Sequence, residues 1–446
     1  MLLFFMRHND LSIIQKIQSL SKKAVELKTL NFQEDSRKSF TSFPHLISKH
    51  DKKAKVFYPL AQSSWDYQEH KAIIDQLNTG QLTMSQNVEN FERRFAEYCG
   101  VEYAIMVNSG SSANLIIVAA LVLLSKYDFK KGDEIIVPAL GWSTSFSPFS
   151  QYGIKLKFVD INLNTLNINE EKIENAISKK TKGILAINIL GNPVEFRKIK
   201  KICKAHNLLL IEDNCESLGA KYESKHTGTF GVAASHSFFF SHHIQTIEGG
   251  MITTNDKDVA EYSRSLRAHG WTRDSLEKNF YQKNPVLNFN NSFKFILPGY
   301  NVRPNELNGV LGLTQLKKFP NLLKGRKENA NLFRNLFGDK TYCKIQKCSH
   351  DSSWYGFSLV LDGDLKNKRA YVLNELYNNG IETRPIVTGN FVKNPVCNLI
   401  DYEISGILKN VEEIDRSGFF VGNSHINLEK QILKLDEILK KLATNN

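Results

Sequence analysis

Apolar runs of strand length alternate with amphipathic helical stretches through the middle of the chain. The runs cover residues 103–107, 133–140, 154–161, 182–190 and 207–214, and apolar residues recur at helical spacing between them, as in 169–180 and 195–206. Continuous apolar runs, unlike alternating ones, are typical of strands that are buried on both faces. This order of elements predicts an α/β fold in which helices wrap a mainly parallel sheet.

Two further regions flank this pattern. Between residues 11 and 30, apolar residues recur at helical spacing along one face. This predicts an amphipathic helix that either packs on the rest of the protein or contacts a partner. From about residue 316 the pattern is largely helical and leads into a smaller α+β region. A chain of 446 residues is too long for one ordinary core. We therefore expect an extension over 1–55, a large domain over 56–320 and a small C-terminal domain over 321–446.

Composition narrows the class of protein. With 41% hydrophobic and 23% charged residues the chain is typical of a globular protein. No apolar run approaches the ~20 residues that span a bilayer, and the first residues lack the features of a signal peptide, so we expect no membrane insertion and a cytoplasmic location. A later methionine such as Met6 could equally be the true start.

The net charge of +12 does not indicate a nucleic-acid-binding protein. Residues 1–55 hold 11 Lys and Arg against 5 Asp and Glu, so half of the excess charge lies in this extension. The rest is spread thinly, without the basic and aromatic motifs of RNA-binding modules. A mildly basic body suits an anionic small substrate such as a sugar nucleotide.

Candidate binding residues follow two of the predicted strands. "VNSGSSAN" (107–114) closes a strand and opens a helix, where the backbone N–H groups of Gly110 and Ser111 could hold a phosphate. A glycine and serine at this point can also be a simple helix cap. Trp142 follows the next strand and could stack on a planar ligand or pack in the core.

Two later segments carry titratable groups. Asp213 ends the run "LLLIEDN", where a carboxylate could cap a following helix or hold a proton on a heterocyclic nitrogen. In "SFFFSHHIQTIEGG" (237–250), Ser237 opens an apparent aromatic strand, and His242 and His243 lie between it and a Gly-Gly turn. Read alone, the two histidines could belong to a surface turn or to half of a metal site.

These segments, in this order, resemble the DegT/DnrJ/StrS family of nucleotide-sugar aminotransferases. The resemblance runs from about Tyr58 to Leu439 and rests on "NSGSSAN", "EDNCESLGA", "SFFFSHHIQTIEGGMITTND", "GYNVRPNELNGVLGLTQL" and "VGNSHINLEKQI". It implies a fold-type I pyridoxal-phosphate-dependent fold, with a large α/β domain and a smaller α+β domain. The extension over 1–55 is not covered by the resemblance.

His242 stands where the aminotransferases of this family carry the lysine that bonds to the cofactor, five positions after Ser237. An imidazole has no primary amine and cannot hold the cofactor covalently, but it can move protons near neutral pH. The substitution therefore resembles the branch of the family that removes the C3 hydroxyl of nucleotide-linked 4-keto-6-deoxy sugars. His243 matches the second histidine of that branch, for which we expect a structural role.

Within this branch the cysteines distinguish two groups. The CDP-sugar group carries an iron–sulfur cluster on cysteines towards the C-terminus, and such a cluster ordinarily takes four thiolates. Here that region holds Cys343, Cys348 and Cys397, and the six cysteines of the chain include no C-x-C or C-x-x-C pair. We therefore expect no iron–sulfur cluster and no other metal. "FILPGYNVRPNEL", "RAHGWTRD" and "IETRPIVTGNF" resemble the iron-free group, which acts on GDP-4-keto-6-deoxy-D-mannose.

The resemblance implies a site and a reaction. Pyridoxamine 5′-phosphate, in exchange with pyridoxal 5′-phosphate, would join C4 of the sugar. His242 would move the proton at the cofactor C4′ while the C3 hydroxyl of the sugar leaves. L-glutamate would then restore the cofactor. Homodimers are implied, with the site at the subunit interface. The expected contacts are Gly110, Ser111, Ser237 and Asn301 of the partner subunit at the phosphate, Trp142 on the ring, Asp213 at its nitrogen, Glu216 one helical turn further on, and Arg384 at an anionic part of the substrate.

Other interpretations stay open at this point. A sugar aminotransferase would need a lysine at position 242, and Lys225 is out of register. A CDP-sugar dehydrase, a regulatory or binding protein on the same fold, and a zinc protein using the two histidines are the further alternatives. The sequence leaves open the nucleotide, the sugar epimer and the purpose of the extension. Arg384 could also be a solvated surface charge.

Overall fold

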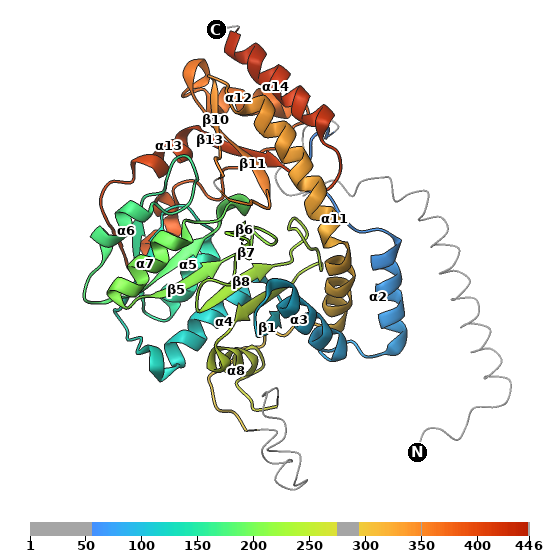
Figure 1. Ribbon diagram of the computed structural model, residues 1–446, viewed down its shortest axis with the longest axis vertical. Coiled ribbons are helices and arrows are strands. Elements are labelled where there is room, and N and C mark those ends of the chain that lie inside the picture. The colour runs from blue at the N-terminus through green and yellow to red at the C-terminus, as the bar shows by residue number, and fades with distance from the viewer. Residues whose placement is uncertain (1–55, 274–293, 349, 445–446) are drawn as a thin grey trace, which may run out of the picture.

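The computed structural model describes residues 56–273, 294–348 and 350–444 (Figure 1). The helix expected over 11–30 lies outside the described residues. No helix within the described ranges is long and apolar enough to cross a membrane.

The centre of the described structure is an eight-stranded sheet in the order β1-β9-β8-β5-β4-β2-β3-β12. Only β9 runs antiparallel to its neighbours β1 and β8, so the predicted mainly parallel sheet is confirmed. The strands are β1 (Tyr103–Val107), β2 (Glu134–Pro138), β3 (Lys155–Val159), β4 (Thr181–Ile187), β5 (Leu209–Asp213), β8 (Ala233–Ser237), β9 (Gly250–Thr254) and β12 (Tyr402–Ile404).

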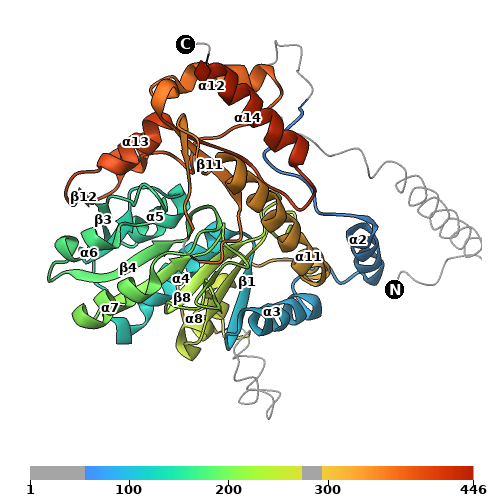
Figure 2. The ribbon, with the colours of Figure 1, turned by 45° about the horizontal axis from the view of Figure 1, so that its top comes forward.

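Helices cover both faces of this sheet (Figures 1 and 2). Alternate strand residues face opposite layers: Ile135 and Val137 of β2 pack in the core that contains α4, α5 and α8, whereas Ile136 packs towards α6 and α7. Above β1 the second face is covered by α3 and α11. These helices are α3 (Gln86–Cys99), α4 (Gly110–Leu123), α5 (Ser143–Gln151), α6 (Glu170–Ala176), α7 (Phe196–His206), α8 (Lys257–Arg267) and α11 (Glu306–Phe337), preceded by α2 (Tyr67–Thr79).

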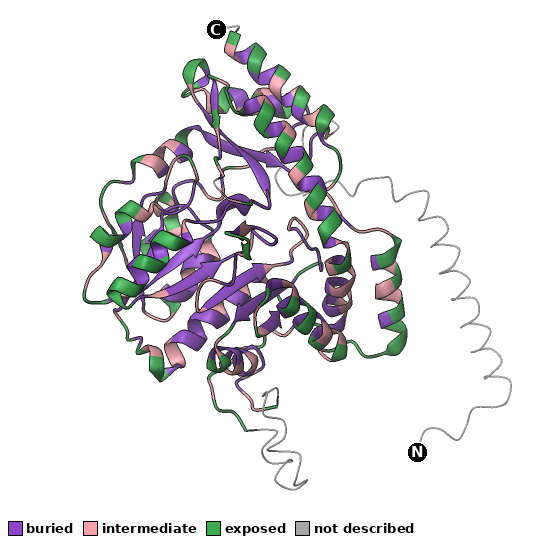
Figure 3. Ribbon diagram, in the orientation of Figure 1, coloured by how far each residue is buried: buried purple, intermediate pink, exposed green. Residues whose placement is uncertain are grey.

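Apart from the edge strand β12, the strands of the large sheet are almost wholly buried, whereas the outer faces of the covering helices are exposed (Figure 3). The helix α4 departs from this rule because its sequence "LIIVAALVL" is apolar on every side and is buried between the sheet, α5 and α8. The start of this helix is therefore fixed firmly against the ends of the strands.

A second, antiparallel sheet in the order β10-β11-β13 forms a separate core with the C-terminal helices, at the top of Figure 1. Its elements are β10 (Cys343–Ile345), β11 (Gly356–Leu361), β13 (Gly418–Gly422), α12 (Arg369–Asn378) and α14 (Glu429–Thr444). The helix α13 (Lys409–Ser417) contacts the same sheet but buries Val411 and Ile414 in the core of the large sheet. A short hairpin and single turns of 3₁₀-helix complete the described elements: β6 (Lys221–Tyr222), β7 (Lys225–His226), η1 (Ser125–Tyr127), η2 (Ile189–Gly191), η3 (Gly363–Leu365), η4 (Phe391–Lys393) and η5 (Pro395–Leu399).

Two connections join the cores. The helix α11 buries Phe319 in the core of α3 and β1 and Phe333 in the core of the second sheet. The strand β12, from the C-terminal part of the chain, pairs with β3 at the edge of the large sheet. The boundary expected between residues 320 and 321 thus falls inside α11, and the division of the chain into domains stays a prediction.

Candidate active site

A cavity of about 310 Å³ lies at the carboxyl ends of the parallel strands, where open α/β sheets bind their ligands. Side chains of the second sheet and of the segment after α12 close its other side. Eight of the nine site residues expected from the sequence line it: Gly110, Ser111, Trp142, Asp213, Glu216, Ser237, His242 and Arg384. Asn301 is exposed and does not line the cavity of its own chain.

The first turn of α4 forms one wall of the cavity. Gly110 and Ser111 begin the helix, so their backbone N–H groups have no acceptor within it. A Cβ atom on Gly110 would lie 2.7 Å from Cβ of Ser237 and 2.9 Å from Sγ of Cys215, closer than real Cβ contacts allow. Glycine at this position therefore lets the start of α4 approach the end of β8, which brings Ser111 and Ser237 to the same wall.

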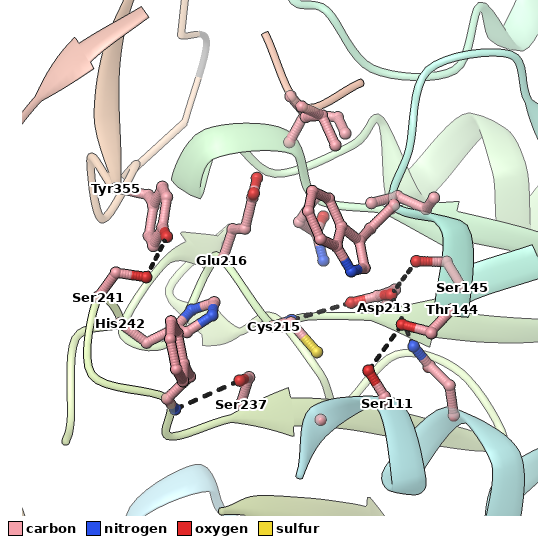
Figure 4. A pocket seen from close by; sticks show the side chains of 18 of the residues that line it. Ser111, Thr144, Ser145, Asp213, Cys215, Glu216, Ser237, Ser241, His242 and Tyr355 are labelled. Atoms are coloured by element: carbon pink, nitrogen blue, oxygen red, sulfur yellow. Dashed lines mark hydrogen bonds between the residues drawn. The ribbon is translucent and has the colours of Figure 1, made fainter. Parts of the chain in front are cut away.

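Asp213 is the last residue of β5 and lies at the floor of the cavity (Figure 4). Its carboxylate accepts hydrogen bonds from Asn114 Nδ2 at 3.0 Å, Ser145 Oγ at 2.6 Å and the Cys215 N–H at 3.0 Å. The preceding Glu212 points to the other side of the sheet, as alternation along a strand requires. It accepts hydrogen bonds from the backbone N–H groups of Gly228, Phe230 and Gly231. Of these two neighbouring carboxylates, Asp213 is therefore the one that faces the cavity.

Glu216 lines the cavity, although the local structure differs from the expectation. Turns, and no helix, follow β5, so Glu216 does not lie one helical turn beyond Asp213. Its Oε2 accepts a hydrogen bond from the Leu190 N–H at 2.9 Å. Burial, with a smaller contribution from the Asp213 charge, raises the pKa of Glu216 to about 7.

The strand that precedes the histidines is shorter than expected. β8 ends at Ser237, and the aromatic residues that follow are not part of it. Phe238 instead packs in the core of α3 and β1. The apparent aromatic strand is therefore a loop, which turns back and carries His242 into the cavity.

His242 lines the cavity with its imidazole beside aromatic rings (Figure 4). The ring centroids of His242 and Tyr355 are 5.1 Å apart. Nδ1 of His242 is buried and has no hydrogen-bond partner among the described residues. Burial lowers the pKa of His242 to about 4, and the Arg326 charge acts in the same direction. The imidazole is therefore neutral at pH 7.

His243 points away from the cavity. Its side chain is 2% exposed, and Nε2 lies 3.1 Å from the Ser353 carbonyl oxygen. Burial lowers the pKa of His243 well below its usual value. This packing supports the structural role expected for the second histidine. No group of three or more His, Cys, Asp or Glu side chains that could hold a metal ion occurs in the described ranges.

The remaining expected residues lie at the rim or outside. Trp142 is 54% exposed, so it is not a core residue, and it faces the cavity from the start of α5. Arg384 pairs through its backbone with Phe420 and also lines the cavity, which places this charge at the site. Asn301 Oδ1 accepts a hydrogen bond from Arg303 Nε at 3.1 Å.

Comparison with known proteins identifies the family. The family model described as the DegT/DnrJ/EryC1/StrS aminotransferase family matches residues 64–425. The chain belongs to this family. GDP-4-keto-6-deoxy-D-mannose 3-dehydratase of Yersinia pseudotuberculosis is 47% identical over 392 residues, which cover 87% of this chain and 100% of that protein. The resemblance to the family and the fold it implies are thus confirmed.

Other members of the DegT/DnrJ/EryC1/StrS family extend the comparison. An Escherichia coli GDP-4-keto-6-deoxy-D-mannose-3-dehydratase structure with bound hydrated PLP is 46% identical, with a TM-score of 0.84 over 86% of this chain and 100% of that one. The dTDP-4-dehydro-2,6-dideoxy-D-glucose 3-dehydratase of Saccharopolyspora spinosa is 32% identical over 372 residues, 80% of either protein. The identity is thus higher to the GDP-sugar enzymes.

The residues at this cavity fit pyridoxamine phosphate. The Asp213 carboxylate, held in one orientation by hydrogen bonds, suits a pyridinium nitrogen. The start of α4 lies close to Ser237 at Gly110, and its first backbone N–H groups are available to bind a phosphate. A lysine amine is not needed for either contact. The cavity residues could therefore hold this cofactor through non-covalent contacts alone.

Several cavity residues were not expected from the sequence. Asn114 had a usable signal, because it lies one helical turn after Gly110 and therefore on the same face of α4. Ser145 follows Trp142 closely, but it is one of several serines in this segment and none of them gives a specific signal. Tyr355 lies more than a hundred residues from His242, in a segment without any motif, so only the fold brings them together. The missed lining residues include Asn114, Thr144, Ser145, Asn188, Cys215, Ser241, Glu248 and Tyr355.

Proposed function

We propose that this protein removes the C3 hydroxyl group of GDP-4-keto-6-deoxy-D-mannose and yields a 4-keto-3,6-dideoxy sugar. The observation that carries the proposal is His242, an imidazole in place of an amine, within the cavity that Asp213 and the start of α4 form. The 47% identity to the Yersinia GDP-sugar 3-dehydratase supports the same substrate.

Pyridoxamine phosphate, when bound, supplies the amino group that joins C4 of the sugar and a ring that takes up electrons. Asp213 keeps the ring nitrogen protonated. Gly110, Ser111 and Ser237 bind the phosphate, together with Asn301 of the partner subunit, and Trp142 packs on the ring. Glu216 is a further cofactor contact, and Arg384 binds an anionic part of the nucleotide.

His242 moves the proton at the cofactor C4′. It is neutral at pH 7 because burial lowers its pKa to about 4, so Nε2 or Nδ1 can accept a proton. The protonated imidazole is then a strong acid for the same reason, which favours transfer of its proton to the departing C3 hydroxyl. Burial thus serves the second half of the proton transfer.

The proposal includes three finer statements. L-glutamate restores pyridoxamine phosphate after each turnover, because the reaction consumes the amino group. The enzyme is a homodimer whose sites lie at the subunit interface, which is where the exposed Asn301 acts. It works in the cytoplasm.

Product analysis tests the proposal. Purified protein is incubated with pyridoxamine phosphate, L-glutamate and either the GDP-linked or the CDP-linked 4-keto-6-deoxy sugar. We expect a product that has lost one water from the GDP-linked sugar, formed faster than from the CDP-linked one. A 4-amino sugar as the main product would show an aminotransferase instead.

Iron content and cysteine replacement test whether the protein belongs to the iron-free group of these dehydratases. Cys343 is buried in the core of the second sheet and Cys397 in the core of the large sheet. We expect Cys343→Ser, Cys348→Ser and Cys397→Ser together to leave turnover largely intact, with a loss of stability where a hydroxyl replaces a buried thiol. Stoichiometric iron in the wild-type protein, or turnover that requires a reductase, would contradict the proposal.

A further inference from the structure

Hydrogen bonding fixes the His242 imidazole only in part, because the Cys215 backbone bonds to the ring while a second polar atom of the ring stays without a partner in the described part of the chain. Its buried Nδ1 has no partner among the described residues, whereas an imidazole that transfers protons is usually held by a hydrogen bond at its second nitrogen. Its neighbours are the rings of Phe239 and Tyr355, with centroids 6.4 Å and 5.1 Å away. Packing against these rings therefore supplies the contacts on the side of the imidazole that hydrogen bonding leaves open.

Tyr355 is held through both its side-chain hydroxyl and its backbone. Its hydroxyl lies 2.9 Å from Oγ of Ser241, the residue before His242 (Figure 4). Its backbone N–H donates to the Leu190 carbonyl at 3.0 Å, and its own carbonyl accepts from Arg326 Nη1 at 3.2 Å. Tyr355 is thus fixed both to the loop that carries His242 and to the body of the protein.

The buried Arg326 side chain bonds to the backbone of both Trp354 and Tyr355. It is 6% exposed and donates to the carbonyl oxygens of Tyr355, Asn423 and Trp354, without an ion pair to any carboxylate in the described ranges. Trp354 has a φ of 51°, which is rare for a bulky residue. A buried charge with carbonyl acceptors only is costly, so its presence indicates that the Trp354–Tyr355 backbone must be held in this unusual conformation.

We propose that Tyr355 is a positioning residue that holds the His242 imidazole in the orientation needed for proton transfer, with Ser241 and Arg326 fixing Tyr355 in turn. This inference rests on the proposed function for its catalytic meaning. The charged and titratable groups that face this aromatic pair are Asp213, Glu216, His243, Arg326 and Arg384.

The first experiment measures the His242 pKa by ¹⁵N-histidine NMR, in holoenzyme with pyridoxamine phosphate bound. The His242 signal is identified by its loss in His242→Asn. We expect Tyr355→Leu to raise this pKa towards its ordinary value, since the lost ring admits water, while Phe357→Leu leaves it unchanged. Phe357 is fully buried in the second-sheet core and serves as the matched control. An unchanged pKa in Tyr355→Leu would overturn the proposal.

Kinetics supply a second readout. Tyr355→Leu should lower kcat roughly 10- to 100-fold with KM for the nucleotide sugar within about threefold, because the imidazole is misplaced while the substrate still binds. Phe357→Leu should keep kcat per folded enzyme within about twofold. Loss of kcat in the control to the same extent would reduce Tyr355 to a stability role and sink the idea.

A gentler pair of variants covers a failure of Tyr355→Leu to fold. Tyr355→Phe and Ser241→Ala each remove one side of the same hydrogen bond, so each should lower kcat by roughly three- to tenfold. The double variant should be no slower than either single one, whereas additive losses would contradict the coupling. The NMR measurement does not depend on turnover, so it tests the positioning of His242 separately from the reaction. A wild-type protein that fails to dehydrate the sugar would contradict the proposed function, while the NMR result would still decide whether Tyr355 positions His242.

Discussion

The Ser145 hydroxyl, near the start of α5, donates a 2.6 Å hydrogen bond to Oδ2 of Asp213 at the end of β5. Asn114 of α4 donates to the same oxygen. Two helices thus fix the direction of one buried carboxylate before any ligand arrives. The contact joins the end of a parallel strand to the helices that follow two other strands, which is the arrangement that gives α/β sheets their ligand sites.

Removal of the Asp213 charge should weaken cofactor binding. Asp213→Asn replaces a charged acceptor by a neutral amide, so we expect the affinity for pyridoxamine phosphate to fall roughly 10- to 100-fold in a calorimetric titration. Ser145→Ala removes one supporting bond and should cost roughly three- to tenfold. Ser147→Ala on the same helix, whose hydroxyl bonds to the Ser143 carbonyl, is the control and should bind as wild type. An Asp213→Asn protein with unchanged affinity would show that this carboxylate does not meet the cofactor.

Gly110→Ala should damage the phosphate wall. The added methyl group would lie 2.7 Å from Cβ of Ser237, so α4 or β8 must shift. We expect at least about tenfold weaker binding of pyridoxamine phosphate together with a loss of stability on the order of 1–3 kcal/mol. Gly406→Ala is a useful contrast, because that glycine has a φ of +78° with open space around it and lies outside the cavity. It should lose stability alone; equal losses of cofactor binding in both variants would refute the role of the close approach.

The pKa of Glu216 predicts a pH dependence of stability. Burial raises this pKa from 4.5 to about 7, so the folded protein holds the proton more tightly than the unfolded chain does. The carboxyl therefore contributes stability that is fully present below about pH 4.5 and is lost as pH rises through about 7.

Urea unfolding of the cofactor-free protein measures this effect. The free energy of unfolding of wild type minus that of Glu216→Gln should fall by an amount on the order of 1–3 kcal/mol between those pH values. The exposed Glu437→Gln serves as the control for general pH effects. A difference that rises with pH, or stays flat, would mean that Glu216 is not held protonated by its surroundings.

Much of this site could be predicted from the sequence because its residues are tied to strand ends. Gly110 follows one continuous apolar run and Asp213 ends another, and parallel strands bring their carboxyl ends together at one edge. The aromatic residues after Ser237 were misread as strand, since apolar residues in a buried loop give the same pattern as a strand. Tyr355 could not be found, because its place beside His242 depends on how the second sheet docks on the first.

His242 carries the proton in the proposed reaction, and the cofactor is held at this site without a covalent bond to position 242. His242→Asn keeps a polar side chain of similar reach but cannot take up a proton, so it should bind pyridoxamine phosphate as wild type and stall before water is lost. His242→Lys provides the matched comparison, because an amine restores covalent attachment and should abolish dehydration.

Rapid-quench measurement of dehydration with enzyme in excess over the GDP-linked 4-keto-6-deoxy sugar tests this most directly. Saturating pyridoxamine phosphate is present in each sample, so differences in cofactor affinity do not enter the rate. We expect the single-turnover rate of His242→Asn to fall at least about a hundredfold below wild type, as loss of a general acid and base requires. An asparagine variant that dehydrates the sugar at the wild-type rate would contradict the account.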